Sequence, residues 1–219
     1  MKIVDLSHTI YEGMPYYPGT EPPILQVANT IEVDGFTETR MSIYTHIGTH
    51  IDAPSHILKN KPSLDKLPID HFIGRAMFLD VSVMSYDTIP VSSLLKYKDL
   101  ITNLDFVIIK TGWSRHWGKQ DYFKGFPSLS EEAAHWLATF NLKGVGIDAI
   151  SVDRMDTTTF PVHKIFFRKN MIVVENLTNL DSAGKEVFIF SCMPLKIKDA
   201  DGSPVRAFGI LGPGPASLY

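Results

Sequence analysis

The segment from residue 41 to residue 52 alternates strictly between two kinds of side chain. Its odd positions carry Met, Ile and Thr, and its even positions carry Ser, Tyr, His, Gly, His and Asp. A β-strand projects successive side chains to opposite faces, so a period of two predicts a strand with one packing face and one polar face. The polar face then presents His46, His50 and Asp52 in one row, with Gly48 between the two histidines.

A helix over the same residues is the poorer interpretation. At about 100° per residue, Asp52 would lie about 200° round the helix from His50, so the polar groups would not share a face. The β-branched residues and Pro54 also disfavour a helix. Two imidazoles and a carboxylate in one row are typical of a transition-metal site, with zinc as the first choice and manganese or iron as alternatives.

His56 lies just beyond this strand, after Pro54 forces the chain to turn. The residues alone leave two roles open for it, a further metal ligand or a titratable group beside the metal. Three of the eight histidines fall between residues 46 and 56. Because they are in phase with a strand and an aspartate, a chance cluster of ordinary surface or core histidines is the weaker alternative.

Composition excludes several classes of protein. The 21 basic and 24 acidic residues leave a net charge of −3, which provides no electrostatic footprint for nucleic acid or an anionic membrane. No apolar run approaches the roughly 20 residues that span a bilayer, and the N-terminus has no apolar signal segment. The single cysteine, Cys192, cannot form an internal disulfide and is expected as a small buried hydrophobe. We therefore expect a cytoplasmic protein.

Hydrophobic patterning predicts a mixed α/β fold. Without repeats, low-complexity tracts or linkers, residues 1–219 are expected to form a single domain. Asp34-Gly35 and Asp201-Gly202 are expected as hairpin turns. Strands are predicted at residues 2–10, 25–33, 36–49, 75–83, 106–110, 145–150, 171–174, 186–197 and 205–210, and helices near residue 91 and at 133–140. Strand hairpins at both ends with βα units between them favour a mixed sheet covered by a few helices.

The histidine segment resembles the signature of the metal-dependent cyclase family, which includes bacterial kynurenine formamidases and isatin hydrolases. The resemblance rests on the string His46-x-Gly48-Thr49-His50-x-Asp52-Ala53-Pro54-x-His56. Further similar segments are Asp5-Leu6-Ser7, the loop at residues 14–19, Lys110-Thr111-Gly112-Trp113, Gly146-Ile147-Asp148-x-x-Ser151-x-Asp153, His163 and Glu175-Asn176-Leu177. The fold that this resemblance implies is a compact layered β/β/α domain, similar to the swivelling β/β/α type, which assembles as a homodimer or homotetramer.

Carried over to this sequence, the resemblance implies a role for each matching residue. His46, His50 and Asp52 would hold one metal, and Asp52, His163 and Glu175 would contribute to a second or shared position, giving one or two ions per subunit. His56 would donate and accept the proton. Without the resemblance, neither His163, in a loop-like stretch after Pro161, nor Glu175, at a strand end, would be selected.

The implied activity is metal-dependent hydrolysis of a small amide. The metal would polarise the scissile carbonyl and lower the pKa of a bound water towards about 7, giving a hydroxide nucleophile. His56 would act as acid and base, because an imidazole with a pKa near 6.5 can do both at neutral pH. Tyr16 and Tyr17 are the candidates for an aromatic wall that binds the substrate. Kynurenine formamidases typically have tryptophan at the position of Tyr17, so this sequence departs from their pattern there.

Three functional hypotheses follow. The first is hydrolysis of N-formyl-L-kynurenine to L-kynurenine and formate in tryptophan catabolism. The second is an isatin-hydrolase-like opening of a cyclic amide by the same metal and the same His56. The third is a structural metal-binding protein without turnover, which the extra imidazole of His56 disfavours.

Other residues carry weaker signals. Asp148 and Asp153 are interpreted as carboxylates that shape loops. Trp113, His116 and Trp117 either line a pocket or cap the core, and the sequence does not choose between these roles. The sequence contains no Ser-His-Asp nucleophile elbow and no Gly-rich phosphate loop.

Overall fold

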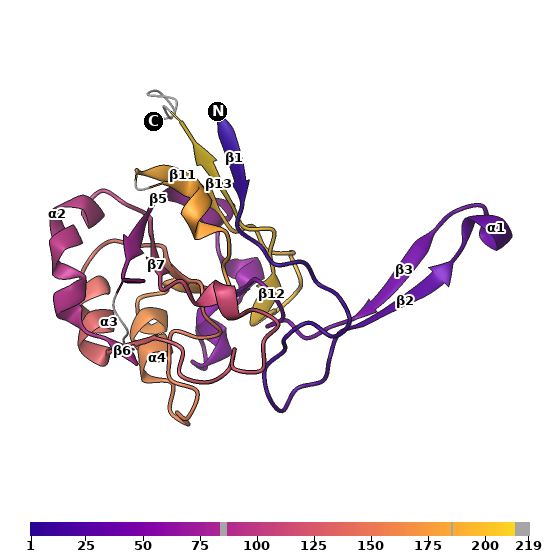
Figure 1. Cartoon of the computed structure of the whole chain (residues 1–219), viewed down its shortest axis with the longest axis horizontal. Coiled ribbons are helices and arrows are strands. Elements are labelled where there is room, and N and C mark those ends of the chain that lie inside the picture. The colour runs from indigo at the N-terminus through magenta and orange to yellow at the C-terminus, as the bar shows by residue number, and fades with distance from the viewer. Residues whose placement is uncertain (84–86, 185, 213–219) are drawn as a thin grey trace.

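A nine-stranded mixed sheet forms the centre of the protein, as seen in a computed structural model that describes residues 1–83, 87–184 and 186–212 (Figure 1). The strand order is β1-β13-β11-β5-β7-β9-β10-β4-β12. These strands are β1 (Lys2–Asp5), β4 (His50–Asp52), β5 (Ile73–Asp80), β7 (Phe106–Lys110), β9 (Gly144–Ile147), β10 (Ile172–Glu175), β11 (Phe188–Ser191), β12 (Gly202–Pro204) and β13 (Phe208–Leu211). β5, β7, β9 and β10 are parallel, and the strands on either side of them are antiparallel. The predicted mixed sheet is confirmed.

The central strands are apolar on both faces because both faces of the sheet are covered. In β7, Val107 and Ile109 join the apolar cluster beneath the helices, and Phe106 and Ile108 join a second cluster on the opposite face. Near-continuous apolar runs of this kind are typical of buried parallel strands. The helices α2 (Lys98–Ile101), α3 (Glu131–Leu137) and α4 (Pro161–Arg168) all contribute to the first cluster and lie together in Figure 1.

Short elements complete the layers. The strands β6 (Thr88–Ile89) and β8 (Ser128–Leu129) form a small parallel pair. Seven 3₁₀ turns lie in the described part of the chain: η1 (Pro54–His56), η2 (Leu64–Lys66), η3 (Ile69–Phe72), η4 (Val91–Ser93), η5 (Leu95–Tyr97), η6 (Trp113–His116) and η7 (Leu180–Ala183). The predicted helix at 133–140 is confirmed as α3, where the Ser130 side chain accepts the Ala133 N–H at 3.1 Å, as an N-cap residue does.

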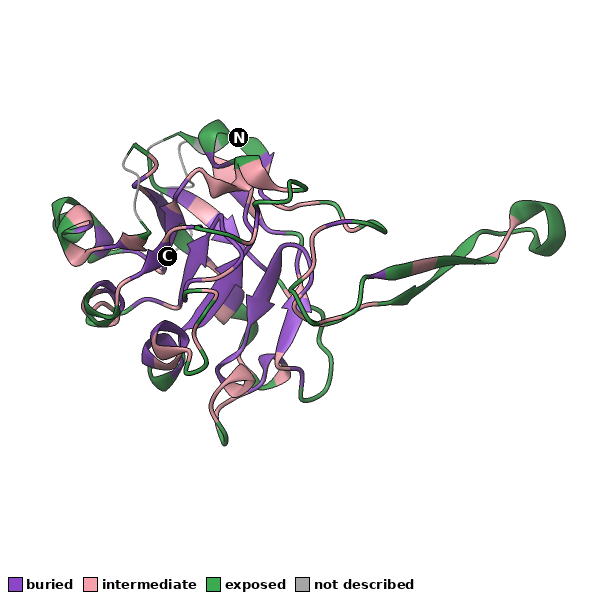
Figure 2. Cartoon of the chain, turned by 60° about the horizontal axis from the view of Figure 1, so that its bottom comes forward, coloured by how far each residue is buried: buried purple, intermediate pink, exposed green. Residues whose placement is uncertain are grey.

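A two-stranded arm projects from the body of the molecule (Figures 1 and 2). It consists of β2 (Ile24–Asn29), the single-turn helix α1 (Ile31–Asp34) and β3 (Glu38–Ser42). The hairpin predicted around Asp34-Gly35 is therefore present, but α1 replaces the expected two-residue turn. Several large apolar side chains of the arm are exposed to solvent: Ile24, Val27, Ile31, Val33, Phe36 and Met41.

The continuous strand expected at residues 36–49 is wrong. β3 ends at Ser42 and β4 begins at His50, so His46 lies on a turn between them. Two features break the strand. Gly48 has a φ of 61°, which an extended strand cannot contain, and the Thr45 hydroxyl donates to Asp201 at 3.1 Å.

The closing hairpin expected around Asp201-Gly202 is also wrong in its pairing. β11 and β13 do pair antiparallel, but Asp201-Gly202 is not the turn between them. Instead, Gly202 begins β12, which pairs with β4 at the opposite edge of the sheet. The chain thus crosses the molecule between β11 and β13, a long-range connection that local patterning does not reveal. The prediction of a single domain over residues 1–219 stays a prediction.

Candidate metal centre

The centre is built first on the antiparallel pair β4 and β10. Ile51 points into the apolar cluster on the face away from the helices, so His50 and Asp52 on either side of it point to the helix-bearing face. The register places Glu175 opposite His50, and directly opposed residues project to the same face. His50 Nε2 consequently lies 3.4 Å from Asp52 Oδ1 and 3.5 Å from Glu175 Oε2.

The helix α4 adds a second imidazole from above the sheet. The stretch around His163 after Pro161 was interpreted as loop-like, but it is helical, and Pro161 at the first helical position favours a helix start. His163 in the first turn points down to the sheet, where its Nε2 lies 3.2 Å from Glu175 Oε1 and 3.4 Å from Asp52 Oδ2. His163 is 4% exposed, Glu175 5% and Asp52 1%, so these charges are removed from water.

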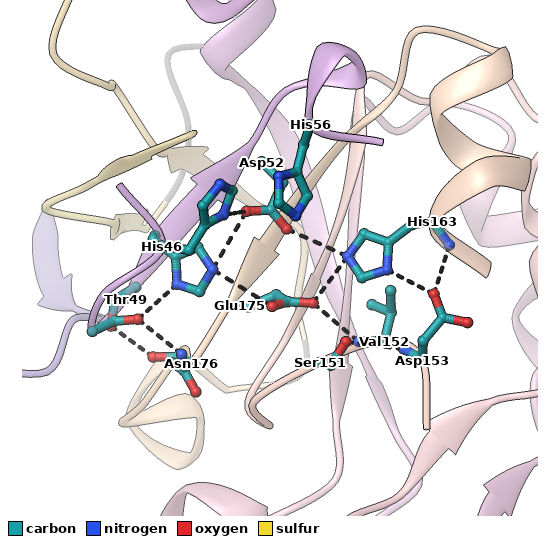
Figure 3. A network of polar contacts seen from close by, with 12 residues as sticks. His46, Thr49, Asp52, His56, Ser151, Val152, Asp153, His163, Glu175 and Asn176 are labelled. Atoms are coloured by element: carbon teal, nitrogen blue, oxygen red, sulfur yellow. Dashed lines mark hydrogen bonds and ion pairs between the residues drawn. The ribbon is translucent and has the colours of Figure 1, made fainter. Parts of the chain in front are cut away.

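His46 approaches from the turn before β4 rather than from a strand row. Its Nδ1 lies 2.6 Å from Asp52 Oδ1. Three groups of possible metal ligands result, each with its ligand atoms within 4.8 Å of one another: His46, His50 and Asp52; Asp52, His163 and Glu175; and the more exposed His46, His56 and Asp201. Asp52 joins the first two groups through its two oxygens (Figure 3). The structure therefore brings all five predicted ligands together.

The outer nitrogens of the three imidazoles indicate that the site suits a cation. His46 Nε2 lies 3.0 Å from Asp201, His50 Nδ1 lies 2.9 Å from the Gly48 carbonyl oxygen, and His163 Nδ1 lies 2.7 Å from Asp153. Each outer nitrogen faces an acceptor to which it can donate an N–H, so with a metal bound the inner nitrogen would be free to offer its lone pair to the ion. A divalent cation between them satisfies this arrangement, because metal-binding histidines usually donate their other N–H in this manner.

The electrostatics point the same way. Burial lowers the pKa of His46, but the charges of Asp52 and Asp201 outweigh burial and raise it from 6.5 to about 10. Burial also opposes a charge on His163, yet its bonds to Asp153, Asp52 and Glu175 raise its pKa well above 6.5. Despite burial, the neighbouring imidazoles hold the pKa of Asp52 well below 3.8. The centre thus attracts positive charge into the protein interior.

His56 lies beside this centre, at the end of the 3₁₀ turn η1. Its ring is 3.9 Å from the His46 ring and 6.4 Å from the His163 ring, measured between centroids. Burial lowers its pKa, Asp52 opposes that effect, and the His46 and His163 charges add to it. The side chain is 30% exposed, whereas His50 and His163 are sealed, so His56 lies at the open side of the centre.

Known proteins resemble this chain in sequence and in fold. The family described as "Putative cyclase" (Cyclase) matches residues 4–154, which is more than half of the chain. That match decides the family. The chain belongs to the Cyclase family.

Two relatives with known sequences match almost from end to end. An uncharacterized protein of Methanocaldococcus jannaschii is 30% identical over 96% of this chain and 100% of its own length. The kynurenine formamidase of Bacillus cytotoxicus is 30% identical over 93% of this chain and 95% of its own.

Solved structures resemble the whole chain as well. Isatin hydrolase A from Ralstonia solanacearum superposes with a TM-score of 0.87 at 23% identity, covering 96% of this chain and 92% of that one, which shows a shared fold. A protein from Bacillus stearothermophilus described as a "predicted metal-dependent hydrolase" reaches a TM-score of 0.80 at 29% identity, covering 95% and 97%. The compact α/β architecture expected of a Cyclase-family chain is confirmed.

Asp153 has a role that its interpretation as a loop-shaping residue missed. One oxygen accepts the backbone N–H of Val162 at 2.9 Å, and the other accepts both the backbone N–H and the Nδ1–H of His163. Asp153 thus starts α4 and orients its histidine. Asp148 fits the original interpretation, because its carboxylate accepts the backbone N–H groups of Thr111 and Gly112. The different role of Asp153 follows from its contacts with the helix α4, which was not predicted from the sequence.

A relay of side chains holds His50 from behind. Tyr122 donates to the Asn176 side-chain oxygen at 2.5 Å, and the Asn176 amide donates to the Gly48 carbonyl oxygen at 2.8 Å. That carbonyl oxygen also accepts from His50. Asn176 has a φ of 56°, a left-handed conformation that asparagine tolerates better than most residues. Tyr122 was missed because nothing in its local sequence indicates a contact with Asn176.

The two tyrosines of the N-terminal loop differ in their surroundings. Burial raises the pKa of Tyr17, the charge of Glu175 adds to this rise and the charge of His163 opposes it. Tyr16 is half-buried. Trp113 and Trp117 pack against the helix-side core, and Trp113 donates its indole N–H to the Tyr122 carbonyl oxygen at 2.8 Å, which favours the core-capping alternative for both.

Proposed function

We propose that this protein is a metal-dependent hydrolase of non-peptide C–N bonds that converts N-formyl-L-kynurenine and water into L-kynurenine and formate. One observation carries the proposal: two groups of candidate ligands share the buried Asp52, and the imidazole of His56 lies beside them on the open side. The sequence likeness to the kynurenine formamidase of Bacillus cytotoxicus supports the choice of substrate.

The two ligand groups define where the cation would bind. His46, His50 and Asp52 would hold one ion, and Asp52, His163 and Glu175 would hold a second or share the first. A divalent metal bound there polarises a carbonyl oxygen and makes water more acidic at neutral pH. The nitrogen and oxygen donors suit zinc first, with manganese or iron as alternatives.

His56 would carry the proton. In the proposed reaction, water oxygen forms a bond to the formyl carbon and the C–N bond breaks. The His56 ring would accept the proton that the attacking water loses and return it to the leaving nitrogen. Its position outside the two ligand groups that share Asp52, and its partial exposure, leave it free for this transfer.

The N-terminal loop would hold the aromatic part of the substrate. The charges of Glu175 and His163 act on the Tyr17 hydroxyl, and the ring is 36% exposed, so it can cover a substrate at the open side. Tyr16, next to it, would extend this wall. A tyrosine presents a smaller face than tryptophan and adds a hydroxyl, so an aromatic wall of this kind also suits a compact cyclic amide of the isatin type.

A substrate panel tests the proposal. The protein is loaded with zinc, manganese or iron, and hydrolysis of N-formyl-L-kynurenine, formanilide, isatin and small cyclic imides is followed. Turnover of N-formyl-L-kynurenine that is lost on chelation supports the formamidase assignment, and preference for isatin would transfer the assignment to ring opening. If the metal-loaded protein turns over none of them, the hydrolase assignment fails and a structural metal site replaces it.

Assembly and location complete the proposal. An isolated two-stranded ribbon is marginally stable in water, and this one leaves Val27, Val33 and Phe36 exposed by 69%, 84% and 53%. Covering the arm in a homodimer or homotetramer would remove this apolar surface from water.

The single cysteine, with no disulfide to maintain, supports a cytoplasmic location. No helix in the described ranges has the length and apolar character needed to cross a membrane.

A further inference from the structure

Asp201 lies between the candidate metal ligand His46 and the candidate acid/base His56. The same oxygen, Oδ2, is 3.0 Å from His46 Nε2 and 3.3 Å from His56 Nδ1. Its other oxygen, Oδ1, accepts the Thr45 hydroxyl at 3.1 Å. One carboxylate therefore contacts the two imidazoles that flank the open side of the centre.

The backbone around Asp201 fixes this carboxylate. The Asp201 carbonyl oxygen accepts the Ala53 N–H at 2.8 Å, and Gly202 pairs with Asp52 in the β12–β4 ladder. A Cβ atom at Gly202 would lie 2.5 Å from His46 Cε1, so only glycine allows the imidazole to lie against this strand. Asp201 is thus held by the same strand edge that carries Asp52.

We propose that Asp201 is a positioning residue that orients both imidazoles at once. By accepting the N–H of His46 Nε2, it directs the Nδ1 lone pair of His46 towards Asp52 and the cation site. By accepting the N–H of His56 Nδ1, it leaves Nε2 of His56 as the free base and fixes the plane of the ring. The His56 part rests on the proposed hydrolase function, whereas the His46 part requires only that a metal binds.

Two variants separate geometry from charge. Asp201→Ala removes both acceptors, whereas Asp201→Asn keeps an oxygen that can face the imidazoles and an amide that can face Thr45. Asp199→Asn is the matched control, because it removes a carboxylate charge from the same loop, two residues before Asp201. The backbone φ of 56° at residue 199 suits asparagine. The Asp199 carboxylate pairs with Lys66 at 3.7 Å, and its backbone N–H donates to Asp65 Oδ1 at 3.0 Å, so its polar contacts lie away from both imidazoles.

The first readout is metal affinity, measured by competition of Zn²⁺ or Mn²⁺ between the protein and a chromophoric chelator. We expect Asp201→Ala to weaken binding about 10- to 100-fold, the usual effect of losing the outer partner of a metal-binding histidine. Asp201→Asn should recover part of this loss, and Asp199→Asn should match the unsubstituted protein. Unchanged affinity in Asp201→Ala would overturn the His46 part.

The second readout is the tautomer of His56, observed by long-range ¹H–¹⁵N correlation NMR of the zinc-loaded protein. Protonated Nδ1 is expected in the unsubstituted protein and in Asp199→Asn, and a shift towards protonated Nε2 is expected in Asp201→Ala. The same tautomer in all proteins would overturn the His56 part. This readout does not require turnover.

Kinetics on the substrate found by the panel complete the test. Asp201→Ala should lower kcat about 10- to 100-fold with KM within about twofold, because acid–base geometry contributes to the chemical step. An unchanged kcat would overturn the His56 part while leaving the hydrolase function intact. If no substrate is turned over, the function fails, and the metal affinity and tautomer still decide the role of Asp201.

Discussion

The Asp153 carboxylate lies 2.7 Å from Nδ1 of His163. The same oxygen also accepts the His163 backbone N–H at 3.0 Å, so one group begins the helix α4 and orients the imidazole that the helix carries. The position of a candidate metal ligand is therefore coupled to the start of a helix. This coupling makes α4 part of the site and not only a cover for the sheet.

Replacement of Asp153 should weaken metal binding at the second ligand group. We expect Asp153→Ala to lower the affinity for Zn²⁺ or Mn²⁺ about 10- to 100-fold, because the His163 ring loses its outer acceptor. The loss of the cap should also cost about 1 kcal/mol of unfolding free energy. Chelator competition and urea denaturation measure the two effects. Asp156→Asn, in the same loop and exposed, is the control, and equal affinity in the two variants would contradict the prediction.

Removal of the metal should destabilise the folded protein. The buried carboxylates of Asp52 and Glu175 lose their positive partner, and only the folded state assembles the ligands. A metal present at 100 times its Kd stabilises the folded state by about 2.7 kcal/mol. For a chain of this length that corresponds to a fall in Tm of about 5–11 °C on chelation. Thermal melts with and without chelator measure this fall in Tm. Coincident melts would show that metal binding does not stabilise the folded protein.

Gly202→Ala should displace His46. The added methyl group would lie 2.5 Å from the ring, so the imidazole must move away from Asp52 or β12 must shift. We expect a loss of metal affinity of at least about tenfold. Gly209→Ala is the matched control, because it places a methyl 3.0 Å from Phe188 in the same sheet but away from the site. Gly209→Ala should lower stability while metal affinity stays normal, and equal affinities in both variants would be inconsistent with this explanation.

His8 should make folding stability depend on pH. Its ring stacks on Trp117 at 3.9 Å, and burial lowers its pKa from 6.5 to about 4. Between pH 6.5 and pH 4, His8 binds a proton in the unfolded chain but stays neutral in the folded chain. The unfolding free energy is therefore unaffected by His8 above pH 6.5 and decreases as the pH falls towards 4. From pH 7 to pH 5 the loss is about 1–2 kcal/mol after allowance for partial exposure.

The variant His8→Phe tests this contribution while keeping a ring against Trp117. Urea denaturation at pH 7 and pH 5 gives the change in unfolding free energy for both proteins. The unsubstituted protein should lose about 1–2 kcal/mol more than the variant over this interval. Equal losses in the two proteins would assign the pH dependence to other groups.

The arm should mediate self-association. Val27→Lys together with Val33→Lys places charges on apolar positions that a partner copy would have to bury. We expect the unsubstituted protein to elute as a dimer or tetramer in size-exclusion chromatography with light scattering, and the double variant to shift towards the monomer. Ile69→Lys, at a residue 76% exposed outside the arm, is the control. A monomeric unsubstituted protein would refute the assembly proposal.

Local patterning predicted most of the elements correctly. The apolar runs at β7, β9 and β10 depend on neighbours in the chain, so hydrophobic patterning reveals them. The helix α4 was missed although Pro161 is a local start signal, because the Asp153 carboxylate that accepts its first N–H groups and the sheet on which it packs lie outside the helical segment.

The row of His46, His50 and Asp52 illustrates both sides of this division. Alternation correctly predicted that His50 and Asp52 share a face, because two residues of one strand are related by local geometry alone. His46 reaches Asp52 by another path, through a turn held by Gly48 and by Thr45 bonded to Asp201. The residue grouping was right, but the geometric reason given for His46 was wrong.

By itself, the sequence determined the ligand types, the strand that carries two of them and the placement of the chain in a family. Only the tertiary structure decided that Asp153 orients His163, that Asp201 lies between His46 and His56, and that Tyr122 supports His50 through Asn176. These contacts join residues separated by between 10 and 155 positions. Interactions over such separations depend on how strands order within a sheet, and strand order is set by the burial of the whole core rather than by any local pattern.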